Sequence, residues 1–325
     1  MNPPLVITEK QAFQSQLLSW YDLNQRALPW RGERDAYRVW LSEIMLQQTR
    51  VAAVIAYYQK FLQRFPTLQA LASARLSSVL AAWSGLGYYR RARMLHQAAR
   101  EIVKQHSGQF PKTAGELADL PGIGRYTAAA VASIAFDEPK AVVDGNVERI
   151  LNRLSGSLLT TMDSWNFAEA LLFHDRPGDF NQAMMELGAT VCLPRDPNCL
   201  GCPIRAFCNS RSRLKVVRLK PRRRKRTLSY ALCRSSKGVL LVRRPGTSTL
   251  MPGMWELPEL SSKPTLETAA FLFQVRHSIT LTDYVVSVFE GNHPGPSGKH
   301  FTPAQIARLP LTGLAKKILS RAAVI

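Results

Sequence analysis

The stretch Lys112–Phe136, KTAGELADLPGIGRYTAAAVASIAF, decides the fold of the first two thirds of the chain. Thr113 with Glu116 three residues later has the pattern of a capping box, which begins a short helix. The string LPGIG at Leu120–Gly124 predicts a tight turn, and the alanine-rich run from Arg125 predicts a second helix. We therefore expect a helix, a hairpin and a second helix.

Two glycines of this hairpin, Gly122 and Gly124, are candidates for binding a phosphate. Without a Cβ they let backbone N–H groups face outward at a helix N-terminus, where the helix dipole favours an anion. An ordinary turn between two helices is the alternative, and Gly-x-Gly alone is weak evidence. The whole string LPGIGRYTA is more specific, so we expect the hairpin to grip one DNA strand.

The segments on both sides of the hairpin also have helical periodicity. Amphipathic runs such as Ala36–Phe65 and Met94–His106 are separated by short Pro or Gly punctuation. Residues 9 to about 190 therefore predict an all-α domain. With 325 residues, of which 46% are hydrophobic, the chain can bury a sizeable core and form two or three domains.

The charge balance indicates an anionic partner. Lys and Arg number 43 against 23 Asp and Glu, which gives a net charge of +20 and a pI near 10.2. Nucleic acid is the first expectation, and an acidic membrane surface the second. The longest apolar run, Ala128–Phe136, is far below the roughly 18 residues of a membrane span, and MNPPLVITEK lacks a signal pattern. We expect a cytoplasmic, nucleoid-associated bacterial protein.

Four of the five cysteines lie close together and predict a metal site. They have the spacing Cys192-x6-Cys199-x2-Cys202-x5-Cys208, whereas Cys233 stands apart. Four thiolates at such short spacings can surround one metal centre. Structural zinc and an iron–sulfur cluster both accept four cysteines, so the spacing leaves both open.

After the cysteines the chain changes character. Ten of the sixteen residues of Arg211–Arg226 are Lys or Arg, which predicts a linker that is either a solvated tether or a direct phosphate contact. Short β-rich runs follow at residues 228–234, 238–243 and 283–289. We expect a helical domain at 1–210 with its cysteine loop at 192–208, a linker at 211–226, and a small α+β domain at 227–325.

Two carboxyl groups stand out as candidates for acid–base chemistry. Glu43 lies in a helical segment with unusually apolar flanks, VWLSEIMLQQT, where desolvation would raise its pKa as a general acid requires. Asp144 begins another helix with Asn146 two residues on, a position that also fits a plain N-cap. A protonated acid paired with an ionised carboxylate is the logic of glycoside cleavage. Most helical Glu residues, however, are solvated surface groups.

Taken together, the strings resemble the helix-hairpin-helix DNA glycosylase superfamily, and within it the MutY-type adenine DNA glycosylases. The likeness covers roughly residues 10–210 closely and the rest loosely. The matching strings occur in this order: LPWR (28–31), SEIMLQQTRV (42–51), GLGYYRRAR (85–93), LPGIGRYTAAAV, VVDGNVERI, MELGATVC and the four cysteines.

This resemblance implies specific roles. The cysteines would hold a [4Fe-4S] cluster, Glu43 would protonate adenine, and Asp144 would face the deoxyribose C1′. The other residues with implied roles are Tyr126 and Asn146 in orienting the catalytic groups, Trp30, Arg31 and Glu186 in the adenine pocket, and Gln48, Leu86 and Tyr88 in probing the opposite base and filling the gap in the base stack. An aromatic wedge suits an enzyme that must extrude a base.

The closest competing branch is that of endonuclease III, which shares the hairpin, the aspartate and the cluster. That branch places a nucleophilic lysine where this chain has Tyr126. Without the amine no Schiff base forms, so the resemblance implies a monofunctional glycosylase that leaves an abasic site. The expected substrate is double-stranded DNA with adenine opposite 8-oxoguanine or guanine, and a monomer suffices.

The tail resembles the Nudix-like C-terminal domain of the same enzymes through WELPE at residues 255–259. The acidic Nudix box should follow, but Leu260–Phe273 offers only Glu267, so pyrophosphohydrolase activity is not expected. At the place of the family's Phe-Ser-His recognition loop stands Ile279-Thr280-Leu281, or the nearby His277-Ser278. An iron–sulfur protein that only binds DNA remains the non-enzymatic alternative, although Glu43 and Asp144 would be acidic liabilities beside phosphates.

Overall fold

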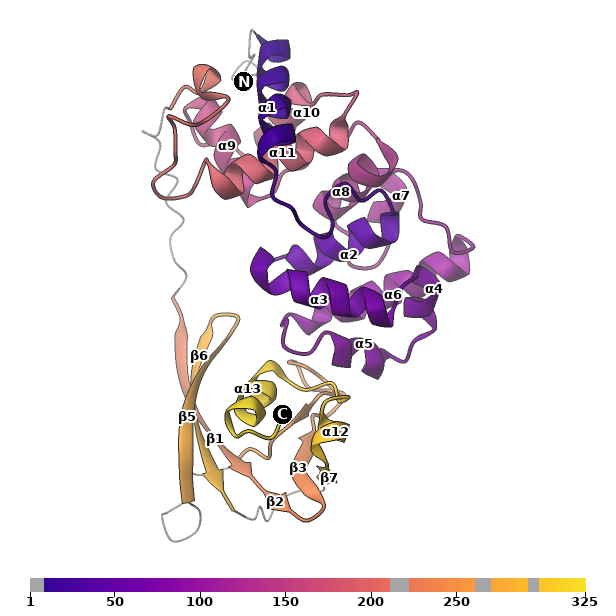
Figure 1. Cartoon of the computed structure of the whole chain (residues 1–325), viewed down its shortest axis with the longest axis vertical. Coiled ribbons are helices and arrows are strands. Elements are labelled where there is room, and N and C mark those ends of the chain that lie inside the picture. The colour runs from indigo at the N-terminus through magenta and orange to yellow at the C-terminus, as the bar shows by residue number, and fades with distance from the viewer. Residues whose placement is uncertain (1–8, 211–221, 261–269, 292–297) are drawn as a thin grey trace. The chain divides into compact units, whose positions relative to one another are not determined.

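The computed structural model describes residues 9–210, 222–260, 270–291 and 298–325, and the chain divides into two compact units (Figure 1). The first unit holds Met1–Gln59, Thr67–Gln69 and Gln97–Arg218, and the second holds Lys60–Pro66, Ala70–His96 and Leu219–Ile325. These units are defined by packing and do not follow the domain boundaries that the sequence predicts. Those boundaries stay predictions, and residues 211–221 of the expected linker lie outside the described residues.

Helices joined by short loops make up residues 10–190, which confirms the mainly α class. Their bounds are α1 Lys10–Asn24, α2 Ala36–Leu46, α3 Val51–Arg64, α4 Leu68–Ser73, α5 Leu76–Ala82, α6 Tyr89–Gln105, α7 Ala114–Ala118, α8 Arg125–Phe136, α9 Gly145–Ser155, α10 Thr161–Leu171 and α11 Pro177–Thr190. The run expected at 36–65 is two helices rather than one. Gln48 has a left-handed φ of 54°, which interrupts the helical backbone between α2 and α3.

The hairpin between α7 and α8 has the predicted local structure. The Thr113 side chain accepts from the backbone of Glu116, whose carboxylate reaches back to the Thr113 N–H, so the capping box is complete. Ile123 N–H donates to the Leu120 carbonyl over 3.1 Å, which closes the turn. Gly122 has a φ of 76°, a conformation that glycine adopts without strain.

Helices α1, α9, α10 and α11 enclose a core cluster of the first unit. Its central side chains are fully buried, among them Phe13, Leu17, Leu151, Ala183 and Leu187. Each large side chain buried in this way stabilises the fold by about 1.5–3 kcal/mol. Helix α8 contacts both α2 and α11. A short run of alanines makes this close approach possible, because Ala128–Ala130 and Ala132 are all buried.

The C-terminal part of the second unit is a small α+β structure. Three strands form one sheet in the order β1 (Arg224–Leu232), β6 (Thr282–Glu290), β5 (Ala270–Ile279), with β1 parallel to β6. The other sheet contains β2 (Arg234–Ser235), β3 (Gly238–Arg243), β4 (Trp255–Glu256) and β7 (Lys299–Phe301). Helices α12 (Pro303–Ile306) and α13 (Gly313–Arg321) complete it, and α13 buries Leu314, Ile318 and Leu319 in the core.

Two features here differ from the sequence expectation. Strand β1 begins at Arg224, three residues inside the expected linker, because its backbone pairs with Thr282–Tyr284 while its long basic side chains stay exposed. The WELPE string contributes only a two-residue strand at Trp255–Glu256. Glu267, the single acidic residue in the expected place of the Nudix box, lies outside the described residues. No helix in the described part of the chain is long and apolar enough to cross a membrane.

Replacing Gly178 with Ala should lower the free energy of unfolding by about 1–3 kcal/mol. A Cβ there would lie 2.7 Å from the Ser133 carbonyl oxygen and 2.8 Å from Ile134 Cα, so α11 would have to move away from α8. Thermal unfolding measures the effect. The control Gly115→Ala in α7, where a Cβ meets nothing within 4 Å, should leave stability unchanged or raise it. Equal melting temperatures for the two variants would contradict the close approach of α11 to α8 at Gly178.

Candidate active site

Glu43 lies on the inward face of α2 and is almost completely removed from water. Its neighbours Val39–Leu41, Ile44 and Met45 are buried with it, and its own exposure is 6%. Burial raises the pKa of this carboxyl above 4.5, and the hydrogen bond from Tyr126 and the charge of Arg31 act in the opposite direction. The raised pKa matches what the apolar flanks predict for an acid.

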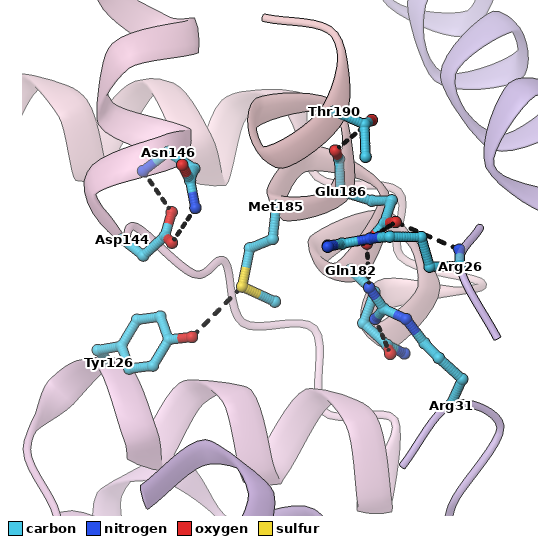
Figure 2. Close-up of polar contacts among 9 residues, drawn as sticks. All are labelled: Arg26, Arg31, Tyr126, Asp144, Asn146, Gln182, Met185, Glu186 and Thr190. Carbon is cyan, nitrogen blue, oxygen red and sulfur yellow. Dashed lines mark hydrogen bonds and ion pairs between the residues drawn. The ribbon is translucent and has the colours of Figure 1, made fainter. Parts of the chain in front are cut away.

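Tyr126, the second residue of α8, connects the hairpin to Glu43. Its hydroxyl donates to Glu43 Oε2 over 2.8 Å and lies 3.3 Å from Met185 Sδ, toward which it points in Figure 2. Burial raises the pKa of Tyr126 well above 10, and the negative charges of Glu43 and Asp144 raise it further. The phenol therefore stays protonated and remains a donor.

Asp144 is both the N-cap of α9 and a member of this group. Its Oδ1 accepts from the backbone N–H groups of Asn146 and Val147, each over 2.8 Å, and its Oδ2 accepts from Asn146 Nδ2 over 2.9 Å (Figure 2). Burial raises the pKa of Asp144, whereas these three N–H donors lower it because they favour the carboxylate. Burial thus acts on both carboxyl groups in the same direction. Any difference between their pKa values has to come from hydrogen bonding, since Asp144 accepts from three N–H donors and Glu43 accepts from one hydroxyl.

Glu186 anchors a cluster of cations on α11. Arg26 donates from Nε to Glu186 Oε1 over 2.5 Å and from Nη2 to Oε2 over 3.0 Å. Arg31 also donates to Oε2, over 2.6 Å. Arg31 also donates to Gln182, as Figure 2 shows. Burial raises the pKa of Glu186, but the bond from Arg26 and the charge of Arg31 outweigh it, so the net pKa is lowered. Trp30, which directly precedes Arg31 in the sequence, is buried, and its ring packs edge-on against that of Tyr58.

Helix α11 joins these two groups because consecutive residues point to each of them. Met185 faces Tyr126, and Glu186 faces the arginines (Figure 2). Gly188 allows α11 to approach α9, since a Cβ there would lie 2.6 Å from Asn146 Cβ. Arg149 then bridges the helices by donating to the Gly188 carbonyl over 2.6 Å and to Asn146 Oδ1 over 2.9 Å. The position of Asn146, and with it Asp144, depends on this contact.

All four cysteines of the loop line one cavity, together with Arg153 and Arg205. None forms a disulfide, and Arg153 donates to Cys192 Sγ over 3.1 Å, a bond that favours the thiolate. Burial raises the pKa of Cys192, and it raises the pKa of Cys202 to about 11. Within the described residues, no group of three or more Cys, His, Asp or Glu is already spaced as a set of metal ligands. The donor chemistry and the shared cavity nevertheless fit a metal centre.

The remaining predicted residues lie at exposed turns or in the other unit. Gln48 is exposed in the turn after α2, and the hairpin glycines Gly122 and Gly124 are exposed. Leu86 and Tyr88 belong to the second unit, where Leu86 is buried and Tyr88 is 46% exposed. The first unit therefore brings together Glu43, Tyr126, Asp144, Asn146, Arg31 and Glu186 by direct bonds or through their charges.

Sequence reasoning missed four residues that hold this site together: Arg26, Arg149, Gln182 and Met185. Arg26 lies two residues before LPWR, and Arg149 belongs to VVDGNVERI, so both are close to strings already singled out. Gln182 lies one helical turn before Glu186 on α11, and Met185 directly precedes Glu186. That spacing was the available signal.

Comparison with known proteins agrees with this geometry. Residues 41–162 match the model of the HhH-GPD superfamily of base excision DNA repair proteins. The chain is 50% identical over 224 residues to the adenine DNA glycosylase of Mus musculus, and the match covers 64% of this chain and 44% of that protein. For the human adenine DNA glycosylase the identity is 50% over 228 residues, with 66% and 42% covered. The resemblance to MutY-type enzymes is confirmed, and the chain spans less than half the length of these two relatives.

Two solved structures share the fold of the helical part. A thermostable thymine-DNA glycosylase is 30% identical, with a TM-score of 0.60, and the match covers 64% of this chain and 98% of that one. Endonuclease III, trapped in a covalent complex with DNA, is 21% identical with a TM-score of 0.56 over 64% of this chain and 98% of that one. The second likeness concerns the fold alone.

Changing Glu186 to Gln should destabilise the first unit by about 3 kcal/mol, because it leaves the Arg31 side chain, only 12% exposed, without its counter-charge. Since the pKa of Glu186 is lowered, this stabilisation should be complete above about pH 4.5 and lost as the pH falls through the folded-state value. Denaturant unfolding at several pH values measures both effects.

The control is Arg26→Met, which removes a partner whose side chain is 39% exposed. It should cost less than Glu186→Gln, because Arg31 still neutralises the buried Glu186 carboxylate and the freed end of Arg26 is replaced in a partly exposed position. An equal loss of unfolding free energy in both variants would contradict the conclusion that the buried Arg31 is the cation that needs Glu186 as its counter-charge.

Proposed function

Because the chain belongs to the helix-hairpin-helix superfamily of base excision DNA repair proteins, we propose that it is a monofunctional adenine DNA glycosylase. It would remove adenine mispaired with 8-oxoguanine or guanine in double-stranded DNA and leave an abasic site. The observation that carries the proposal is the buried Glu43, hydrogen-bonded to Tyr126 and within the electrostatic range of Asp144.

In this proposal Glu43 is the acid that protonates the leaving base. Its burial keeps a proton on the carboxyl above its ordinary pKa, and Tyr126 occupies Oε2 as a donor. The proton is thereby left on Oε1, which would donate to adenine N7. Protonation turns adenine into a neutral leaving group and weakens the glycosidic bond.

Asp144 then meets the positive charge that develops on the deoxyribose. Its three N–H donors favour the ionised form, and they fix both oxygens so that little reorganisation is needed as charge develops. The carboxylate would stabilise the cationic sugar or capture it briefly, and water would complete the abasic site. Asn146, held in turn by Arg149, keeps the orientation of Asp144.

Excision without strand cleavage follows from the chemistry of position 126. A lyase forms a Schiff base with the sugar aldehyde and needs an amine. The phenol of Tyr126 offers none, and its hydroxyl is committed to Glu43 and Met185. We therefore propose that the strand stays intact until the abasic site is cleaved by other means.

Duplex DNA is the proposed partner, with the hairpin amides of Gly122 and Gly124 on one phosphate and the net charge of +20 favouring association. Extrusion of adenine would use Gln48, Leu86 and Tyr88, and the pocket of Trp30, Arg31 and Glu186 would receive the base. A single subunit suffices for these steps.

Reading of the opposite base is proposed for the β5–β6 hairpin. Its tip is Thr280-Leu281, where Thr280 has a left-handed φ of 50° and Leu281 is exposed. Ser278 is occupied by a short bond to Asp283, which also pairs with Arg223. The family's Phe-Ser-His loop offers a serine hydroxyl and a histidine imidazole, and this tip does not offer that pair. We therefore propose that this chain discriminates 8-oxoguanine from guanine less strongly than that loop would imply.

For the cysteine cavity we propose a [4Fe-4S] cluster held by Cys192, Cys199, Cys202 and Cys208. When bound, such a cluster would cross-link the loop to α11 and α9 and stabilise the fold, leaving base chemistry to the carboxyl groups. Arg153 would hold the Cys192 sulfur by its hydrogen bond.

The central test is an oligonucleotide with adenine opposite 8-oxoguanine or opposite guanine. We expect release of adenine without scission before alkali treatment, whereas a borohydride-trapped nick would favour a lyase. Glu43→Gln and Asp144→Asn should each lower the single-turnover rate by about 10²–10⁴-fold while binding to an uncleavable analogue persists. The control Asp119→Asn removes an exposed carboxylate from the same unit and should be neutral. Normal excision rates in both site variants would contradict the assignment of Glu43 and Asp144 as the catalytic groups, whereas absence of adenine release from the parent protein would favour a protein that only binds DNA.

Changing Tyr126 to Phe should move the alkaline limb of the pH–rate profile to higher pH. The hydrogen bond from Tyr126 lowers the pKa of Glu43, so its loss raises that pKa and keeps the acid protonated further into the alkaline range. Single-turnover rates across pH measure the limb. Tyr284→Phe, a phenol on β6, serves as the control and should not move it. A limb that shifts to lower pH would contradict Glu43 as the acid.

Metal analysis tests the cluster. We expect iron and sulfide with a broad visible absorption band, and loss of that band with loss of thermal stability in Cys199→Ser. A colourless protein that contains zinc would contradict the iron–sulfur assignment.

A further inference from the structure

The loop between α5 and α6, the two helices labelled in Figure 1, contains Tyr88, which has an unusual backbone conformation. Gly85 and Gly87 have φ angles of 99° and 80°, and Tyr88 itself has a φ of 49°. A left-handed conformation is costly for a residue with a Cβ and persists only where its surroundings enforce it. The surroundings that enforce it lie in this loop and its flanking helices.

A cation–aromatic stack supports the Tyr88 ring. The guanidinium carbon of Arg91 lies 5.2 Å from the ring centroid of Tyr88 and 5.6 Å from that of Trp83. Both distances are within the range in which a cation is attracted to an aromatic face. Arg91 is the guanidinium common to both rings, so it links the exposed Tyr88 to the core.

The base of this stack is rigid. Trp83 is fully buried, packs edge-on against Phe61 with ring centroids 5.8 Å apart, and donates from Nε1 to the Gly87 carbonyl over 3.0 Å. Arg91 begins from the first turn of α6, where its N–H donates to the Tyr88 carbonyl over 2.8 Å. Desolvation lowers the pKa of Arg91 to about 10, so the side chain is still a cation at neutral pH.

We infer that Arg91 is a positioning residue which holds Tyr88 ready to enter the DNA base stack. This inference rests on the proposed function, in which Tyr88 is the wedge that accompanies extrusion of adenine. A ring already held on a fixed platform loses little conformational entropy when it inserts, whereas a mobile ring would have to be ordered during extrusion. The charge of Arg91, and not only its volume, is required.

The test compares Arg91→Met, which keeps an unbranched stem but removes the cation, with Arg91→Lys, which keeps a cation. Extrusion is followed by the fluorescence of 2-aminopurine placed beside the mispair, in a Glu43→Gln background so that no excision intervenes. We expect Arg91→Met to lower the extrusion equilibrium about fivefold, and Arg91→Lys to recover part of it. Arg90→Met, which removes the same charge from the adjacent exposed position, is the matched control and should have no effect on extrusion.

A double-mutant cycle separates positioning from a general loss of structure. If Arg91 acts through Tyr88, the effect of Arg91→Met should vanish in a Tyr88→Ala background. An effect that persists there, or no effect of Arg91→Met where Tyr88→Ala impairs extrusion, would overturn the inference. If Tyr88→Ala leaves extrusion unchanged, both the wedge role and the inference fail.

A measurement without DNA keeps the inference distinct from the proposed function. Amide hydrogen exchange in the 84–89 loop should be faster in Arg91→Met than in the parent and in Arg90→Met, because the stack that holds the loop is gone. Unchanged exchange would overturn the inference even if the protein excises adenine. Faster exchange in a protein that releases no adenine would leave Arg91 as the support of the loop while the proposed function fails.

Discussion

The site depends on one constraint, which is that Glu43 is kept out of water yet remains hydrogen-bonded. Its carboxyl is surrounded by the buried face of α2 and touches the hydroxyl of Tyr126 at the start of α8. The contact between these helices is possible because α8 presents alanines to its neighbours. A larger side chain in that run would push α8 away and let water reach the acid. The composition of one helix therefore controls the pKa of a group on another.

Asp144 is controlled differently, by its local backbone. An N-cap carboxylate receives N–H donors from the next two or three residues wherever a helix starts, so Asn146 and Val147 supply them without any tertiary contact. Tertiary structure adds burial and the neighbouring charges. Two carboxyl groups with similar burial thus differ in how well the ionised form is stabilised, and the difference comes from the start of a helix.

What the sequence could predict follows from the same distinction. The capping box, the glycine turn and the N-cap at Asp144 are local, and all three were predicted correctly from neighbouring residues. Arg26 and Glu186 are 160 residues apart, and no local pattern pairs them. Strand β5 was missed because its exposed and buried residues do not alternate cleanly, and a bulge lies at Phe271–Phe273. The break at Gln48 was missed because a left-handed non-glycine residue has no clear sequence signal.

The distribution of charge explains how an acidic site can exist in a protein suited to a polyanion. Three carboxyl groups lie in or beside this site, and the surroundings of each affect its charge in a different way. Burial raises the pKa of Glu43 and so favours its protonated form, and Arg26 and Arg31 neutralise Glu186. Burial raises the pKa of Asp144 as well, but its three N–H donors act against burial and favour the carboxylate. In the proposed mechanism, Asp144 therefore supplies the negative charge that a cationic sugar would meet, and the cations that neutralise Glu186 would border the space that holds the uncharged base.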